Sequence, residues 1–98
     1  ANHWGMIAWH DADAGRYQRV LETCERLFAQ QAAPPEIAYV AAARAWAAMD
    51  APDKAFANLN RAIDGGWTYA PDLESTEFDR LRDTPEWQAL VKRGFVVL

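Results

Sequence analysis

The stretch from Glu36 to Gly66, EIAYVAAARAWAAMDAPDKAFANLNRAIDGG, predicts two amphipathic helices joined by a turn at residues 50–53. Apolar residues recur at three- and four-residue steps in each half, so each set shares one face of a helix. The first set is Tyr39, Ala42, Ala43 and Trp46, and the second is Ala55, Phe56, Leu59, Ala62 and Ile63. A pair of short helices cannot cover its own apolar face, so we expect the pair to stack on neighbouring helices.

The same pattern can be placed a second time, from residue 2 to residue 33. Gly15 falls at the turn, and the helix after it has the strongest apolar periodicity in the chain. The first helix carries Trp4, Ile7 and Ala8, and the second carries Val20, Leu21, Cys24, Leu27 and Phe28. Asp11 stands where Trp46 stands in the next copy, so we expect a short or differently capped first helix. The two copies are offset by about 35 residues, and Pro34-Pro35 separates them.

The spacing of aromatic and small residues in both copies closely resembles the tetratricopeptide repeat. This resemblance implies an all-α fold in which antiparallel helix-turn-helix repeats stack as a short right-handed α-solenoid. A single domain, residues 1–98, would contain repeat one (1–35), repeat two (36–66) and a closing segment (67–98). Asp50 stands where the family usually has glycine, and Asp enters the left-handed region more readily than most residues. Trp67 stands near the family's usual closing proline, so an irregular exit from repeat two is expected.

The closing segment contains two shorter helix signals. A short helix is expected from residue 75 or 76 to residue 82. Thr84-Pro85-Glu86 then combines a hydroxyl cap, a proline in the first turn and an acid near the positive end of the helix dipole. The apolar face of this second helix is Trp87, Leu90 and Val91. The run from Phe78 to Leu90 resembles a closing segment of bacterial tetratricopeptide proteins, which would pack over the last repeat.

Composition and charge restrict the class of protein. With 98 residues, 51% of them hydrophobic, the chain can build one compact domain. No run of about eighteen apolar residues is present, so we expect no membrane span. A net charge of -4 argues against a nucleic-acid surface. The chain starts at Ala1 without methionine, and no signal peptide is visible. Because its first residues already resemble the interior of a repeat array, we expect a fragment, the C-terminal part of a larger bacterial protein. The cytoplasm is the favoured compartment, and a mature secreted start stays open as an alternative.

The histidines do not form a recognisable metal site. His3 and His10 would lie two helical turns apart, about 10 Å, which is too far to share one ion unless the segment bends. Asp11 and Asp13 lie close by in the sequence and offer carboxylates. We interpret this group as the polar surface of a helix and expect no metal.

The remaining reactive groups also favour a structural interpretation. Cys24 lies on an apolar helix face, where a thiol is buried and inert, and a single cysteine excludes an internal disulfide. The paired acids Glu22 and Glu25, and likewise Glu74 and Glu77, lie among other charged residues and are expected to be solvated. We therefore expect no catalytic residues and no cofactor, and the chain is not expected to be an enzyme.

The resemblance also implies where a ligand would bind. The concave side of such an array is lined by the first helix of each repeat. The expected groove residues are Trp9, Asp13, Ile37, Val40, Arg44 and Ala47, with Gly5, Ala12 and Ala48 beside them. This groove would be mainly apolar with Arg44 as its cation, so we expect a protein partner that supplies an apolar peptide or helix. The lysines and asparagines with which some chaperone adaptors clamp a C-terminal carboxylate are missing, so a chaperone-tail receptor is not expected.

Five tryptophans in 98 residues suggest a second hypothesis. Two repeats are fewer than the three or so that a solenoid usually needs, and exposed tryptophan is favoured at interfaces. Trp4 and Trp9 are therefore candidates for a self-association face that would give a homodimer through the first helix. Two alternatives stay open: a dimerisation or spacer element without a groove ligand, and the accessory domain of an enzyme whose catalytic part lies elsewhere.

Overall fold

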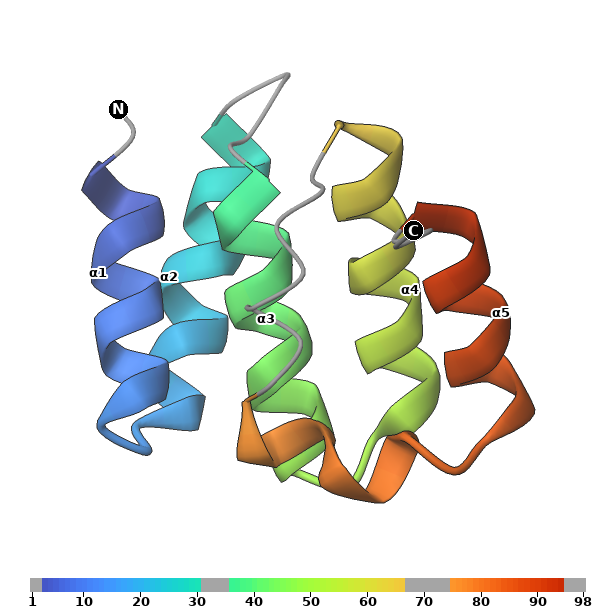
Figure 1. Ribbon diagram of the computed structural model, residues 1–98. Helices are drawn as coiled ribbons and strands as arrows, with labels where there is room; N and C mark the ends of the chain where they lie inside the picture. The colour runs from blue at the N-terminus through green and yellow to red at the C-terminus, as the bar shows by residue number, and fades with distance from the viewer. Residues whose placement is uncertain (1–2, 31–35, 67–74, 95–98) are drawn as a thin grey trace.

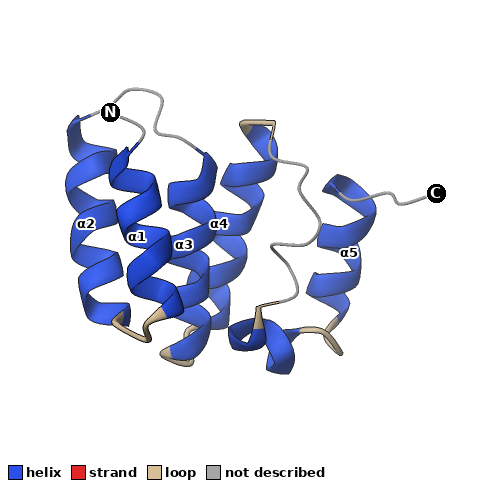
Figure 2. Cartoon of the chain, turned by 60° about the vertical axis from the view of Figure 1, so that its left-hand side comes forward, coloured by secondary structure: helices blue, strands red, loops and turns tan. Residues whose placement is uncertain are grey.

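The computed structural model describes residues 3–30, 36–66 and 75–94, and these ranges are all-helical without a strand. The elements are α1 (His3–Asp13), α2 (Tyr17–Gln30), α3 (Glu36–Ala48), α4 (Pro52–Asp64), the 3₁₀ helix η2 (Thr76–Leu81) and α5 (Pro85–Gly94). Helices α1 to α4 alternate in direction, and α5 lies beside α4 at the far end (Figure 1 and Figure 2). Among the described helices, none has the length and apolar character needed to cross a bilayer.

The helix pair predicted between Glu36 and Gly66 is confirmed as α3 and α4. Asp50 adopts the left-handed region with φ of 63°, as predicted from its place at the turn. The Ala51 N–H donates to the Trp46 carbonyl at 2.8 Å and closes the turn. Pro52 then opens α4, where its missing N–H leaves no hydrogen bond unmade.

Helices α1 and α2 form the second antiparallel pair. Gly15 makes their turn with φ of 77°. Helix α1 has 11 residues where α3 has 13. Its end is fixed by Asp11, whose carbonyl accepts the Arg16 N–H at 2.8 Å and whose carboxylate lies 3.3 Å from the Arg16 guanidinium. This agrees with the prediction of a short, differently capped first helix. The linker at Pro34-Pro35 lies outside the described residues.

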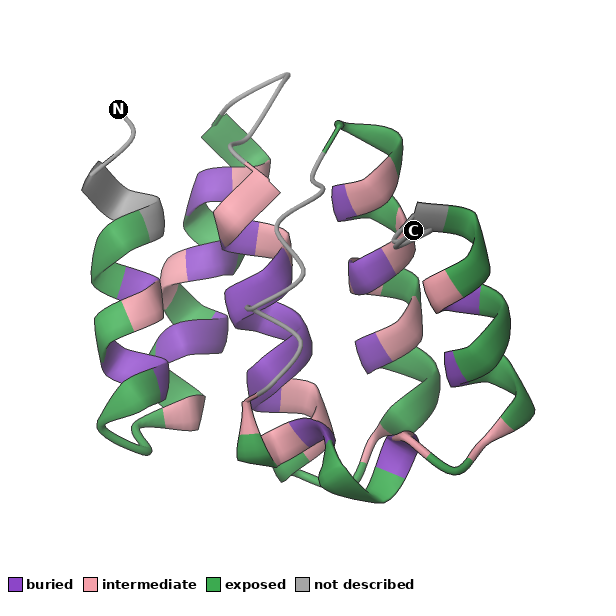
Figure 3. Ribbon diagram, in the orientation of Figure 1, coloured by how far each residue is buried: buried purple, intermediate pink, exposed green. Residues whose placement is uncertain are grey.

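Helix α3 lies at the centre of the molecule and is buried on more than one side. It packs against α1, α2, α4 and η2, and its buried residues run without a break from Val40 to Ala45 (Figure 3). One core cluster joins α1, α2 and α3, and a second joins α3, α4, η2 and α5. Trp9 and Trp46 contact both clusters. The sequence predicted one buried face for this helix, and the structure has two.

The second buried face of α3 is covered by the C-terminal elements. The Phe78 side chain of η2 is fully buried, with its ring centroid 5.6 Å from that of Trp87 on α5. The short helix expected from residue 75 or 76 is present as η2, in the tighter 3₁₀ form. Thr84 caps α5 as predicted, because its Oγ1 accepts the Trp87 N–H at 3.2 Å. The irregular exit predicted at Trp67 lies outside the described residues.

Candidate functional site

The surface predicted as a ligand groove is covered by η2. Val40 is fully buried in the same cluster as Phe78, and Arg44 is only 5% exposed. Of the other predicted groove residues, Trp9, Ile37 and Ala47 are half-buried and Asp13 is exposed. The prediction that Val40 and Arg44 line an open groove is therefore wrong. Residues 76–81 fill the place where a ligand was expected.

Arg44 is instead the centre of a polar network that joins four elements. Its Nε and Nη2 donate to the Glu77 carboxylate at 3.2 and 3.1 Å, and its Nη1 lies 2.9 Å from the Asp13 carboxylate. The Tyr17 hydroxyl donates to Glu77 at 2.9 Å, and the guanidinium carbon lies 4.5 Å from the centre of the Trp9 ring. The side chains of Arg44 and Glu77 are each 6% exposed, so the expectation that Glu77 is solvated is also wrong.

This network shifts the pKa values of two of its members. Burial lowers the pKa of Arg44, but the hydrogen bonds and charges of Glu77 and Asp13 outweigh burial and raise the pKa overall. Burial, and then the hydrogen bond and charge of Glu77, raise the pKa of Tyr17 above its ordinary value of 10.0. Arg44 thus keeps its charge and Tyr17 keeps its proton at neutral pH. The network serves to hold η2 against α1, α2 and α3.

Of the two tryptophans predicted as a self-association face, Trp9 is the one whose side chain is described. Trp9 is half-buried and contacts both core clusters, and the Trp4 side chain lies outside the described residues. The large exposed apolar residues on the described part of α1 are Met6, 44% exposed, and Ile7, 38% exposed. Helix α1 therefore has exposed apolar surface through residues other than the predicted pair.

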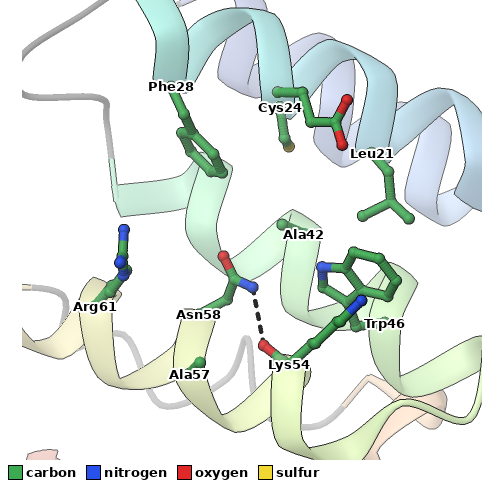
Figure 4. Close-up of a pocket in the computed structure, with 10 residues that line it drawn as sticks. Leu21, Cys24, Phe28, Ala42, Trp46, Lys54, Ala57, Asn58 and Arg61 are labelled. Carbon is green, nitrogen blue, oxygen red and sulfur yellow. Dashed lines mark hydrogen bonds between the residues drawn. The ribbon is translucent and has the colours of Figure 1, made fainter.

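An open groove lies between α2 and α4, with α3 as its floor. Its volume is about 310 Å³. It is lined by Leu21, Cys24, Glu25, Phe28, Ala42, Trp46, Lys54, Ala57, Asn58 and Arg61. Figure 4 shows the α2 side chains on one side, the Trp46 ring at the floor and the polar α4 side chains opposite. Ala42 and Arg44 are two positions apart on α3, so this groove and the covered network lie on opposite sides of that helix.

The α4 rim of the groove carries two cations. Lys54 Nζ lies 4.3 Å from the centre of the Trp46 ring. Arg61, seven residues further along α4, is exposed. Asn58 lies between them and donates its side-chain amide to the Lys54 carbonyl at 2.9 Å (Figure 4). Within the described residues, neither cation lies within ion-pair distance of a carboxylate, including that of Glu25 on the α2 side. The groove thus combines an apolar floor with two cations on its α4 rim and the Glu25 carboxylate on its α2 side.

Cys24 belongs to the wall of this groove but is chemically inert there. It is 1% exposed, and its thiol donates to the Ala38 carbonyl at 3.4 Å. Burial raises the pKa of the Cys24 thiol from 9.0 to about 12. Because the thiolate is the reactive form, the neutral thiol is no nucleophile at neutral pH, as predicted from its apolar helix face.

A second hollow, between α1 and α2, is a weaker candidate. Its volume is about 450 Å³, and it is lined by Ile7, Asp11, Arg19, Glu22, Thr23 and Arg26. The charges are of both signs, and the Asp11 carboxylate is already paired with Arg16. No group of three or more His, Cys, Asp or Glu side chains in the described ranges could hold a metal ion. The groove between α2 and α4 is therefore the stronger candidate for a binding site, because apolar side chains line it between its charged rims.

Comparisons of the chain with protein-family models, curated proteins and solved structures give no match. No activity is therefore transferred from a relative. The groove between α2 and α4 and the covered face of α3 are the features from which a function can be argued.

Proposed function

We propose that this chain is a protein–protein interaction module of the tetratricopeptide type, which binds a partner segment in the groove between α2 and α4. The observation that carries this proposal is the open groove of about 310 Å³ with an apolar floor. Peptide sites on helical proteins have this form, because apolar anchors supply affinity and a few polar groups at the rim supply orientation. The partner is a peptide or helix, as the sequence suggested, but the face that binds it is different.

The contacts between the helices support the repeat arrangement. Helix α1 packs against α3 as well as against α2, and α3 packs against α2. A stack of helix pairs requires such contacts between the first helices of neighbouring repeats. The fully buried α3 residues in the cluster with α1 and α2 are all alanines, namely Ala38, Ala41, Ala42 and Ala45. Their small side chains allow the close approach of helices on which stacking depends.

The floor of the groove contains the groups that would anchor a ligand. Phe28 stacks on Tyr39 with ring centroids 4.6 Å apart, so its ring is held in place from behind. Trp46 is half-buried under Lys54 and is the aromatic residue that α3 contributes to the groove lining. Rigid aromatic groups cost little conformational entropy on binding, which favours them as anchors. The groove is only about two helical turns long, so we expect affinities in the micromolar range.

The proposal is tested by selecting peptides against the chain and then blocking the groove. A displayed library of random fourteen-residue peptides is enriched on the wild-type chain, and the winners are titrated by fluorescence anisotropy. Ala57→Trp places a large side chain in the groove from an exposed position of α4. Ala89→Trp, on an exposed position of α5 outside the groove, is the matched control. We expect at least a tenfold loss of affinity in the first variant and none in the second.

Two results would count against groove binding. One is a library that yields no specific peptide. The other is a set of peptides that bind the wild-type chain and the Ala57→Trp variant equally well, because their site would then lie elsewhere.

A second candidate function, self-association through α1, is favoured by the exposed side chains of Met6 and Ile7. Contiguous exposed apolar surface is typical of interfaces. If α1 mediates a dimer, the wild-type mass in solution is twice that of the chain and the double variant Met6→Glu/Ile7→Glu has the monomer mass. Met49→Glu, in the α3–α4 turn and 45% exposed, is the control that should stay dimeric. A monomeric wild type at high concentration removes this candidate.

A further inference from the structure

We propose that the groove between α2 and α4 selects an acidic amphipathic helix, with its apolar seam on the floor and its carboxylates along the α4 rim. This inference rests on the proposed function of the groove. It goes further by stating the charge and the conformation of the partner.

The charge follows from the two rim cations, whose possible partners on the same helix are engaged or misplaced. Asp64 lies one turn after Arg61, but it is held in an ion pair by Arg93 of α5. Asp53 is adjacent to Lys54 in sequence, and neighbours at one-residue spacing do not face each other on a helix. Across the groove, Glu25 on α2 adds one carboxylate, so the two cations still give the described lining an excess of positive charge. Lys54 lies over the Trp46 ring and Arg61 is exposed, and both can meet carboxylates of a ligand at the rim.

The spacing of the cations matches a helix. Lys54 and Arg61 are seven residues apart on α4, which is two turns or about 10.5 Å along the axis. A ligand helix that lies along α4 has the same pitch. Acidic residues at positions i and i+7 of that helix would then meet Lys54 and Arg61 in turn.

The floor favours a helix over an extended strand. An extended peptide would bring unpaired backbone N–H and C=O groups onto Leu21, Phe28 and Trp46, which cannot pair with them. The polar groups of the groove lie at its rims, where Asn58 already donates one N–H to the Lys54 carbonyl, and not on the floor that such a backbone would meet. A helix satisfies its own backbone internally. The small side chains of Ala42 and Ala57 also leave room for a helix to approach the groove.

The inference is tested with two synthetic helical peptides that share one apolar seam of leucines. One peptide carries glutamate at positions i and i+7 along one edge, and the other carries lysine at the same positions. Binding to the wild-type chain is measured by fluorescence anisotropy at low and high salt. We expect the glutamate peptide to bind at least tenfold more tightly than the lysine peptide, and the difference to shrink as salt rises.

Variants of the rim assign the preference to named residues. Lys54→Gln and Arg61→Gln should each weaken the glutamate peptide by about two- to fivefold, the range for exposed ion pairs. The double variant Lys54→Glu/Arg61→Glu should prefer the lysine peptide, which a mere loss of folding cannot produce. Lys92→Gln is the matched control, because Lys92 is an exposed cation on α5 outside the groove. The affinity of this variant for the glutamate peptide should equal that of the wild type.

The outcomes separate this inference from the function on which it rests. Equal binding of both peptides, with Ala57→Trp blocking both, overturns the acidic preference and leaves the groove as a peptide site. A glutamate peptide that binds as well after proline is placed at its centre overturns the helical conformation. Failure of both helical peptides, where library peptides bind and are blocked by Ala57→Trp, shows a different occupant and overturns the inference as a whole.

Discussion

Removing the Glu77 carboxylate should cost this protein a large part of its stability. Glu77→Ala leaves the Arg44 guanidinium, 6% exposed, with only the Asp13 carboxylate at 2.9 Å, and the Asp13 side chain is 55% exposed. Breaking a buried ion pair in this way costs about 3–5 kcal/mol, and the partly hydrated Asp13 places our estimate near 3. A domain of this size has a total stability of about 5–15 kcal/mol. The melting temperature should therefore fall by roughly 12–24 °C.

The reason for this cost can be tested with a double-mutant cycle. Unfolding in urea is followed by far-UV circular dichroism for Glu77→Ala and for a cycle of Glu77→Leu, Arg44→Met and the apolar pair Arg44→Met/Glu77→Leu. Because the apolar pair leaves no buried charge unpaired, its free energy of unfolding should lie within about 1 kcal/mol of the wild type. Arg80→Ala is the control, since its ion pair with Asp50 at 3.8 Å joins two side chains that are 84% and 82% exposed. It should change nothing measurable.

Two results would refute this reasoning. Glu77→Ala could prove no more costly than Arg80→Ala, which would mean that the Arg44 network is hydrated in solution. The apolar pair could also cost as much as the two single variants together. The loss would then come from packing around Val40 and Phe78 rather than from an uncompensated charge.

Three further predictions concern stability and are measured by urea or thermal unfolding. Burial raises the pKa of Cys24 from 9.0 to about 12, so the folded state keeps the thiol proton to higher pH than the unfolded state. The stability that this provides is complete below pH 9 and is lost as pH rises towards 12, by up to about 1.4 kcal/mol per pH unit. The Cys24→Ala variant should lack this pH dependence of the free energy of unfolding. An equal pH dependence in the variant would contradict the assignment to Cys24. Asp50→Gly should raise stability by about 0.5–1 kcal/mol, because glycine adopts a φ of 63° without steric cost. Asp50→Val should lower stability for the opposite reason. A loss of stability in the glycine variant would show that the Asp50 side chain itself stabilises the turn. Thr84→Ala should cost about 1 kcal/mol because the Trp87 N–H loses its acceptor, and Thr84→Ser should restore it; equal losses in both variants would exclude the cap as the cause.

The helices themselves were predictable because local periodicity determines them. The apolar stripe of α2 and the two halves of the segment from Glu36 to Gly66 repeat at helical spacing, and burial follows that spacing. Local chemistry also predicted the turn at Asp50 and the cap at Thr84. These features depend on a few neighbouring residues, so a single sequence contains them.

The closing of the predicted groove could not be read from local pattern. Arg44 and Glu77 are 33 residues apart, and each looks like a solvated charge within its own segment. Their burial depends on the path of the chain after α4, which places η2 against the side of α3 that carries Val40 and Arg44. The resemblance to a repeat family predicted that the closing segment packs over the last repeat. It did not predict that η2 would reach back to Asp13 of α1 and Tyr17 of α2 through Arg44 and Glu77.

The groove between α2 and α4 was missed for a different reason. Its lining residues Leu21, Cys24 and Trp46 were correctly recognised as apolar, and they were assigned to the core because an isolated pattern does not show how far two helices stand apart. The one signal in the sequence was the seven-residue spacing of Lys54 and Arg61, which puts both cations on one edge of α4. That spacing gains meaning only when α2 and α3 supply an apolar surface beside it.

One side of α3 thus contributes to the stability of the fold, and the other side forms the floor of the proposed binding groove. On one side, a charged pair is shielded from water by η2, with two hydrogen bonds between Arg44 and Glu77 and one from Tyr17 to Glu77. A ligand that entered there would have to displace the fully buried Phe78 and leave Arg44 unpaired, at a cost well above what a short peptide recovers. On the other side, the floor of the groove is already formed, and the internal contact that a ligand on Trp46 would displace is the exposed Lys54 side chain above that ring. Binding to the groove between α2 and α4 should therefore leave the stability conferred by the Arg44 network unchanged. A peptide that raises the melting temperature of the wild type should raise that of the apolar variant Arg44→Met/Glu77→Leu by the same amount, and an unequal shift would mean that the two sides are coupled through α3.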